Sequence, residues 1–193
     1  MPGIHEKYKA IVIGTSAGGL SALSVILEKL PPDYPVPIMV VQHRSKNQRD
    51  LLEEVLQNKC KIRIKQADEK EKIEGGFVYI APPDYHLLVE ADKTFSLSSD
   101  EPVRFSRPSI DVLFETAAIV FKDTLVAIVL TGANNDGAAG IVEVKKYGGL
   151  TIAQDPAEAQ FSAMPDAAIT TTKVKYTWTL LEIQDFLLKT VIT

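Results

Sequence analysis

Short aliphatic runs alternate along this chain with longer segments in which apolar residues recur at helical spacing. Residues 8–13 (YKAIVI) and 37–42 (PIMVVQ) are such runs, and their β-branched content predicts buried strands. Between them, residues 19–30 place leucine and isoleucine at helical spacing, and Pro31-Pro32 end the predicted helix. This alternation of strand and helix predicts a parallel sheet covered by helices.

The middle of the chain follows a different pattern. Strand candidates at 77–81, 86–90 and 95–98 are separated by turn-forming residues and predict an antiparallel β-hairpin appended to the parallel sheet. Beyond them the first pattern returns. The run at 125–130 (LVAIVL) is the least polar strand candidate, which predicts a central position in the sheet. The other predicted elements are helices at 51–56, 110–121, 137–147 and 180–191 and a strand at 150–153.

Composition agrees with a globular chain of one domain. Of the 193 residues, 46% are hydrophobic and 24% are charged, and no linker or low-complexity segment divides them. A formal net charge of −4 argues against nucleic acid as the main partner, because phosphate contacts need clustered Lys and Arg. The polar N-terminus lacks a secretory signal, and no apolar run approaches the roughly 18 residues of a membrane span. We therefore expect a cytoplasmic protein that does not insert into the membrane.

Cysteine and histidine usage adds further expectations. Cys60 is the only cysteine, so no disulfide can form within the chain. The three histidines, at positions 5, 43 and 86, show none of the spacings that are typical of metal ligands, so we expect no metal site.

Reactive groups lie where predicted strands end. The run Gly14-Thr15-Ser16-Ala17-Gly18 lies between a strand and a helix and matches G-x-S-x-G, in which small residues allow a sharp turn that exposes the serine hydroxyl. The N-terminus of the following helix directs backbone N–H groups and the positive end of its dipole to the same place, which suits an oxyanion. Ser16 is therefore the candidate nucleophile.

The same turn also fits a nucleotide-binding protein. Gly14, Ser16 and Gly19 occupy the positions of G-x-G-x-x-G, a turn that cradles a dinucleotide pyrophosphate. That motif expects an acidic residue at the end of the second strand, where this chain has His43. Because adjacent strands lie about 4.8 Å apart, His43 can reach the Ser16 hydroxyl as a general base. His43 thus favours a hydrolase, and a Rossmann-like nucleotide-binding domain is the alternative.

A carboxylate follows the least polar strand. Asp136 lies in the polar loop after residues 125–130, where it can hold the tautomer of His43 and stabilise the imidazolium. Alternatively, Asp136 only caps the helix that begins at Gly137. The order Ser, His, Asp along the chain differs from that of the α/β-hydrolases and argues against a lipase-type fold. His86 is the reserve candidate for the base.

Further motifs accompany these residues in a fixed order along the chain. They are GTSAGG at 14–19, Gln42-His43, Tyr79-Ile80-Ala81-Pro82 with Asp84 and His86, Arg107-Pro108-Ser109-Ile110-Asp111-Val112-Leu113-Phe114, TGANNDGAAG at 131–140, and Gln154-Asp155-Pro156 with Phe161 and Met164-Pro165. Together they resemble the chemotaxis protein-glutamate methylesterases, the CheB type, over essentially the whole chain.

The resemblance implies an activity and assigns roles. The expected reaction is hydrolysis of glutamate γ-methyl esters on methyl-accepting chemotaxis receptors, commonly with deamidation of receptor glutamines, by a doubly wound, mainly parallel α/β domain. The resemblance places the nucleophile on Ser16, the base on His43 and the orienting carboxylate on Asp136. It also implies that the backbone N–H groups of Ala17 and Ala133 receive the oxyanion. Neither a metal nor an organic cofactor is expected.

Candidate substrate-binding residues are less specific in their pattern. The guanidinium of Arg107 can bind receptor carboxylates at the cleft, although a structural salt bridge explains it equally well. His86 is the other candidate for a substrate contact.

The chain departs from the family pattern in its domain content and in its loops. Family enzymes usually carry an N-terminal receiver domain, whereas this chain begins almost at the first strand, so we expect a single catalytic domain, residues 1–193, without a receiver. Ala133-Asn134 stand where Met-Gly is usual. Arg44-Ser45-Lys46 stand where Met-Pro-Pro is usual, and their added cations would suit an acidic receptor surface, although solvated side chains explain them equally well. A module that only docks on chemoreceptor arrays is therefore a further alternative.

Overall fold

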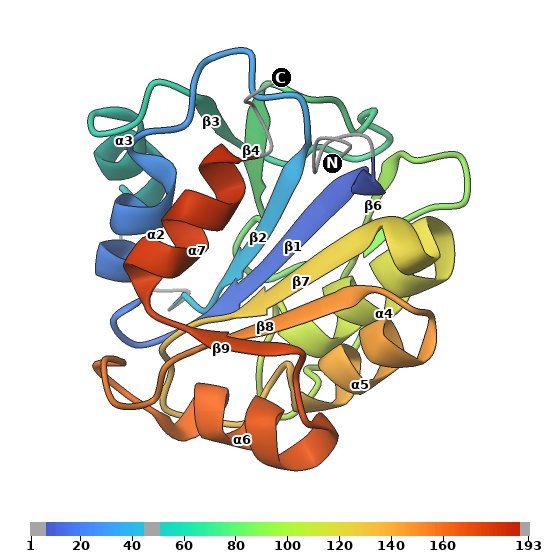
Figure 1. Cartoon of the computed structure of the whole chain (residues 1–193). Helices are drawn as coiled ribbons and strands as arrows, with labels where there is room; N and C mark the ends of the chain where they lie inside the picture. Colours follow the sequence, from blue (N-terminus) through green and yellow to red (C-terminus); the bar gives the residue numbers. More distant parts are fainter. Residues whose placement is uncertain (1–6, 45–50, 190–193) are drawn as a thin grey trace.

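A parallel sheet forms the centre of the molecule, and the computed structural model describes residues 7–44 and 51–189. The sheet has seven strands in the order β3-β4-β2-β1-β7-β8-β9, and each neighbouring pair runs parallel (Figure 1). The least polar run forms β7 beside β1, near the middle of the sheet, as predicted. The strands are β1 (Ala10–Thr15), β2 (Ile38–Gln42), β3 (Arg63–Gln66), β4 (Phe77–Ile80), β7 (Leu125–Val129), β8 (Leu150–Gln154) and β9 (Tyr176–Trp178).

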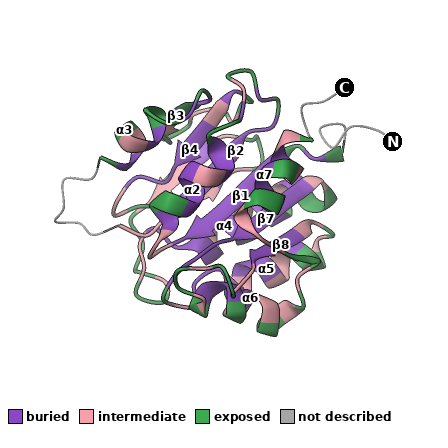
Figure 2. Cartoon of the chain, turned by 60° about the vertical axis from the view of Figure 1, so that its left-hand side comes forward, coloured by how far each residue is buried: buried purple, intermediate pink, exposed green. Residues whose placement is uncertain are grey.

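Helices cover both faces of this sheet, so the predicted doubly wound α/β fold is confirmed. Side chains of β1 alternate between the faces: Ile11 and Ile13 join the core under α2, α3 and α7, whereas Ala10 and Val12 join the core under α4, α5 and α6. Figure 2 shows the strands buried between partly exposed helices. The helices are α2 (Gly19–Leu27), α3 (Leu52–Gln57), α4 (Ile110–Phe121), the 3₁₀ turn η1 (Lys122–Thr124), α5 (Ala138–Lys146), α6 (Ala163–Thr172) and α7 (Leu180–Leu188).

Two of the three strand candidates in the middle of the chain form the predicted hairpin, as a sheet of its own, whereas the candidate at 77–81 forms β4 of the parallel sheet. β5 (His86–Val89) and β6 (Phe95–Ser98) pair antiparallel and make no ladder with the parallel sheet. β4, the strand that precedes the hairpin, pairs with β2 on one side and with β3 on the other, so the hairpin cannot extend the sheet from β4. The hairpin instead packs on α4, where the Val89 N–H donates to Thr116 Oγ1 at 3.2 Å.

Chain connectivity creates a crevice beside β1. From β1 the chain runs to β2 on one side of the strand, and later returns to β7 on the other side. Ligands of open α/β sheets bind in such a crevice, at the carboxyl ends of the strands. Thr15, the last residue of β1, lies opposite Gln42, the last residue of β2, so Ser16 and His43 leave the sheet next to each other.

The remaining expectations concern the ends of elements. The predicted helix 180–191 is α7, and its last two predicted residues, 190 and 191, lie outside the described part of the chain. No helix within residues 7–44 and 51–189 is long and apolar enough to cross a membrane.

Candidate active site

Ser16 lies at the first bend after β1. The Gly19 N–H donates to the Ser16 carbonyl at 2.9 Å, and Gly18 adopts a left-handed backbone with φ of 81° before α2 begins. A side chain at Gly19 has no room, because a β-carbon there would lie 1.9 Å from Gln42 Oε1. The small residues of the G-x-S-x-G run therefore permit the turn that leaves Ser16 half-exposed at the carboxyl end of the central strand β1.

His43 continues directly from β2 and faces Ser16. Its N–H donates to the Thr15 carbonyl at 3.2 Å, which extends the pairing of β1 and β2 by one residue. The Gln42 amide then donates to the carbonyls of both Ser16 and His43, at 2.8 and 3.0 Å. With both backbones fixed in this way, His43 Nδ1 lies 3.2 Å from Ser16 Oγ.

Asp136 completes a chain of side-chain contacts. Its Oδ2 lies 2.8 Å from His43 Nε2, and the residue is 1% exposed. Because a carboxylate can only accept, the proton of the neutral ring resides on Nε2, and the lone pair of Nδ1 points toward Ser16. Ser16, His43 and Asp136, three separate strand-end residues, are thereby brought together in the geometry that proton transfer from the serine hydroxyl requires.

The N-terminus of α4 holds the Asp136 carboxylate. Ser109 Oγ donates to Oδ1 at 2.9 Å, while the N–H groups of Ile110 and Asp111 donate at 2.7 and 3.0 Å. Burial disfavours the anion, but the hydrogen bonds from His43 and from these N–H groups outweigh burial and hold the pKa of Asp136 below its ordinary value. Asp136 also accepts the Gly137 N–H at 3.0 Å, but Gly137 itself is the N-cap of α5, so the alternative that Asp136 only caps this helix is wrong.

A second loop is fastened to the Ser16 turn. The Ser16 N–H donates to the Thr131 carbonyl at 3.0 Å, and Thr131 Oγ1 donates to the Ala17 carbonyl at 2.9 Å. A β-carbon at Gly132 would lie 3.0 Å from Ser16 Cβ, so this loop passes against the serine. Within the part of the chain that the structure describes, neither the Ala17 nor the Ala133 N–H donates to another residue. Both stay available for the predicted role in an oxyanion hole.

Asn134 makes a contact that sequence reasoning missed. Its Oδ1 accepts the Asp136 N–H at 3.0 Å, which orients the amide, and its Nδ2 lies 3.1 Å from His43 Nδ1. From the sequence, Asn134 was notable only because it stands where the family usually has glycine. Neither its contact with His43 nor the role of Gln42 and Ser109 leaves a local signal, because each joins residues far apart along the chain.

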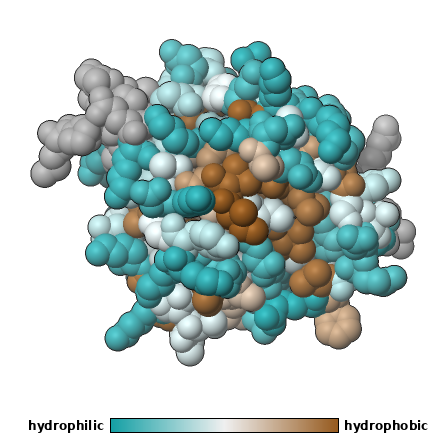
Figure 3. Space-filling model, turned by 90° about the vertical axis from the view of Figure 1, so that its right-hand side faces the viewer, coloured by the Kyte–Doolittle hydropathy of each residue, from teal (hydrophilic) through white to brown (hydrophobic). Residues whose placement is uncertain are grey.

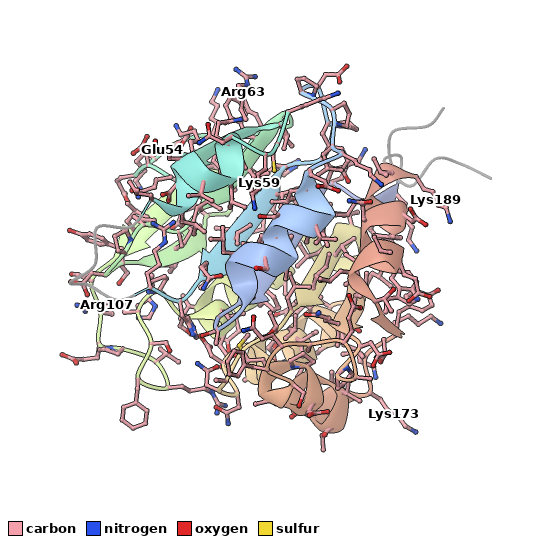
Figure 4. The ribbon with its side chains drawn as sticks, turned by 90° about the vertical axis from the view of Figure 1, so that its left-hand side faces the viewer. Glu54, Lys59, Arg63, Arg107, Lys173 and Lys189 are labelled. Atoms are coloured by element: carbon pink, nitrogen blue, oxygen red, sulfur yellow. The ribbon has the colours of Figure 1, made fainter. Side chains whose placement is uncertain are left out.

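Arg107 borders the site in a structural arrangement. A pocket of about 330 Å³ beside His43 is lined by Arg107 together with Arg44, Phe105 and neighbouring residues. Arg107 Nη2 and Nε donate to Asp84 Oδ1 at 2.6 and 2.9 Å, and Nη1 donates to the Ser99 carbonyl at 2.7 Å. These bonds favour the salt-bridge alternative for Arg107, which Figure 4 shows at the edge of this side of the molecule.

Of the two cations in the loop after His43, Arg44 and Lys46, the structure describes only Arg44. Arg44 forms an ion pair with Glu53, and its side chain is 2% exposed. Its charge is therefore neither solvated nor presented to a receptor surface. Ser45 and Lys46 lie outside the described residues.

His86 requires a correction. It is 2% exposed, its Nε2 lies 3.1 Å from the Glu101 carbonyl, and its Nδ1 accepts the Ser109 N–H at 3.1 Å. With both ring nitrogens occupied by backbone groups, His86 neither faces Ser16 nor lines the pocket beside His43. We therefore withdraw it as a reserve base and as a substrate contact; it supports the segment that carries Ser109.

A larger hollow lies away from these residues. It measures about 740 Å³, surrounds the amino ends of β8 and β9, and is lined by residues such as Lys7, Trp178 and Phe186. Figure 3 shows the side of the molecule on which these amino ends lie, with apolar residues gathered near its middle. None of the predicted site residues lines this hollow, so the smaller pocket is the one relevant to the chemistry. The described residues contain no group of His, Cys, Asp and Glu that could hold a metal ion.

Comparison with known proteins places this arrangement in a family. The chain belongs to the CheB methylesterase family, whose model matches residues 11–187. A crystal structure of the Thermotoga maritima CheB methylesterase catalytic domain superposes with a TM-score of 0.91 at 35% identity, over 95% of this chain and 99% of that one. The predicted family and class of enzyme, a carboxylic ester hydrolase, are thereby confirmed.

Sequence relatives carry concordant names. A Leptospira interrogans protein named putative protein-glutamate methylesterase/protein-glutamine glutaminase is 50% identical over 182 residues, which cover 94% of each chain. A Thermotoga maritima protein named protein-glutamate methylesterase/protein-glutamine glutaminase is 37% identical over 164 residues, which cover 83% of this chain and 48% of that protein.

Proposed function

We propose that this chain is a serine hydrolase that removes methyl groups from glutamate γ-methyl esters of methyl-accepting chemotaxis receptors, in the cytoplasm. The observation that carries the proposal is the contact chain from Ser16 Oγ through both ring nitrogens of His43 to the buried Asp136 carboxylate. It lies at the crevice of a CheB methylesterase fold.

The first half of the reaction forms an acyl-enzyme. His43 Nδ1 takes the hydroxyl proton of Ser16 as Oγ attacks the ester carbonyl carbon. The N–H groups of Ala17 and Ala133 receive the oxyanion, and Asp136 stabilises the imidazolium. When the tetrahedral intermediate collapses, His43 Nδ1–H gives its proton to the departing methoxide, which leaves as methanol.

The second half of the reaction restores the enzyme. Water enters beside His43, gives a proton to Nδ1 and attacks the acyl carbon. Collapse of this second intermediate breaks the bond to Ser16 Oγ, which takes the proton back from His43 and frees a glutamate side chain. The ester, one water molecule and the chain's own residues account for every proton and bond in these steps.

The same acyl-enzyme supports deamidation. A glutamine side chain attacked by Ser16 loses ammonia in place of methanol, with the proton again supplied by His43, and hydrolysis then yields glutamate. The relatives named glutaminases support including this second reaction in the proposal.

Methanol release from a methylated receptor tests the proposal. Wild-type protein is expected to release methanol, and Ser16→Ala to lose about 10⁶ in rate, as in a comparable triad, with unchanged thermal unfolding. A wild-type protein that binds receptors without releasing methanol would instead be a docking module. A Ser16→Ala variant with most of the wild-type rate would contradict the assignment of the nucleophile.

A further inference from the structure

A tight turn beside the pocket presents an aromatic side chain to solvent. Val103 and Ser106 pair through two backbone hydrogen bonds of 3.1 and 2.9 Å, which leaves Arg104 and Phe105 at the tip. Both tip residues have a left-handed backbone, with φ of 48° and 63°. Residues with side chains adopt this conformation at an energetic cost, and two-residue turns of this kind usually contain Asn and Gly. The Phe105 side chain is nevertheless fully exposed, at 103%.

Hydrogen bonds hold the turn at Arg104, one of its tip residues, and at Arg107, just beyond it. Arg104 Nε donates to Asp111 Oδ2 at 2.9 Å, and Asp111 also belongs to the group of N–H donors that bind Asp136. On the other side of the turn, Arg107 is fixed by Asp84 and by the carbonyls of the preceding loop. In Figure 4 the yellow-green loop next to Arg107 projects from the body of the molecule. Phe105 is thus carried on a projecting turn that is tied to the same helix end as the Asp136 carboxylate.

The position of the turn, next to the pocket that reaches His43, indicates that the protein substrate contacts Phe105. Phe105 and Ser106 line the pocket of about 330 Å³ that also reaches His43. A polypeptide that delivers an ester to Ser16 and His43 therefore passes next to Phe105. Strained backbone and a fully exposed aromatic ring at this entrance are features of a surface prepared for a partner.

We propose that Phe105 is a docking residue for the protein substrate. Its ring inserts between apolar side chains on the substrate surface near the esterified glutamate. This inference rests on the proposed function. The turn already holds the Phe105 ring in its exposed position in the free protein, so little conformational freedom is lost when the substrate binds. Burying a phenylalanine ring that is otherwise in water strengthens binding by roughly 10- to 100-fold.

The test compares a protein ester with a small ester. Phe105→Ser and wild type are assayed for methanol release from a methylated receptor and for hydrolysis of p-nitrophenyl acetate. The ratio of the two kcat/KM values, protein ester over small ester, is expected to fall roughly 10- to 100-fold in Phe105→Ser, mainly through the KM for the receptor. Phe105→Trp should restore most of the ratio. Leu181→Ser, which removes an apolar side chain on α7 that is 63% exposed, is the matched control and should leave the ratio unchanged.

Other outcomes overturn the inference in distinguishable ways. An equal loss with both esters would show that the turn only shapes the active centre, and an unchanged ratio would show that the receptor does not contact Phe105. A wild-type dimer in sedimentation that Phe105→Ser dissolves would assign the ring to self-association. A wild-type protein that hydrolyses the small ester but releases no methanol from receptors would overturn the proposed function itself, whatever Phe105 does.

Discussion

The ring nitrogen of His43 that faces Ser16 also faces a second donor. Nδ1 lies 3.2 Å from Ser16 Oγ and 3.1 Å from Asn134 Nδ2, and a ring nitrogen has one lone pair in the ring plane. A hydrogen bond from the amide therefore competes with the hydrogen bond from the hydroxyl. The Asp136 N–H holds Asn134 Oδ1 at 3.0 Å, so the amide cannot easily turn away.

Replacing Asn134 by Ala should speed the attack of Ser16. Removing a competing hydrogen bond worth about 0.5–1.5 kcal/mol should raise the rate of Ser16 phosphonylation by a small fluorophosphonate roughly 2- to 10-fold. Stopped labelling reactions analysed by intact-protein mass give the rate. Asn135→Ala, at an exposed neighbouring position, should react like wild type. A slower Asn134→Ala variant would mean that the amide assists the reaction.

Single residues of this site differ in how well the sequence reveals them. Ser16, His43 and Asp136 each follow an apolar run, so their positions at strand ends could be predicted from local pattern. The hydrogen bonds of Gln42 and Ser109 could not, because they connect segments 26 and 27 residues apart and depend on how the strands are arranged.

At the scale of elements, the N-terminus of α4 is an electrostatic junction. It binds the Asp136 carboxylate and carries a second buried acid, Asp111. Burial raises the pKa of Asp111 above its ordinary value; the Gly140 N–H opposes this, the Asp136 charge adds to it, and Arg104 opposes it. Arg104 therefore helps to keep Asp111 charged next to a second anion.

Loss of Arg104 should change how stability depends on pH. The pKa of Asp111 is higher in the folded than in the unfolded chain, so folding is less favourable as pH rises from about 4 through the folded-state pKa. Arg104→Gln raises that pKa further and should enlarge the fall in unfolding free energy as pH rises above about 4. Urea unfolding at a series of pH values from about 4 upward measures it. In an Asp111→Asn background, Arg104→Gln should add a smaller slope, because Arg104 then lowers only the raised pKa of Glu115; an undiminished slope there would contradict the assigned cause.

Elements with a strong apolar pattern, either a continuous run or helical spacing, could be predicted from the sequence. Elements with a weak pattern could not. The apolar runs that became β1, β2 and β7 are buried on both faces. In contrast, β3 has one buried side chain, β9 is three residues long with none buried, and α6 contains Pro165 and a run of threonines. Their formation depends on packing against the sheet, which a local pattern does not contain. This mattered for the site, since Met164 of α6 packs where a β-carbon at Gly132 would lie.

At the scale of the whole molecule, strand order assembles the candidate site. Ser16, His43 and Asp136 follow β1, β2 and β7, which are neighbours in the sheet although β7 is far from the others in sequence. A parallel sheet could be predicted from alternating strands and helices. The order of its strands could not, because neighbouring strands share no local signature. Adjacency of consecutive strands suggested that His43 lies beside Ser16, whereas the role of Asp136 stayed open until the family resemblance favoured it.

His43 and Asp136 make Ser16 a reactive nucleophile, and covalent labelling tests this most directly. An alkyl fluorophosphonate is incubated with the folded protein, and the modified peptide is identified by mass spectrometry. We expect one phosphonyl group on Ser16, lost in Ser16→Ala and slowed by several orders of magnitude in His43→Ala, which lacks the general base. No label on Ser16, or labelling of another residue that persists in Ser16→Ala, would contradict the account.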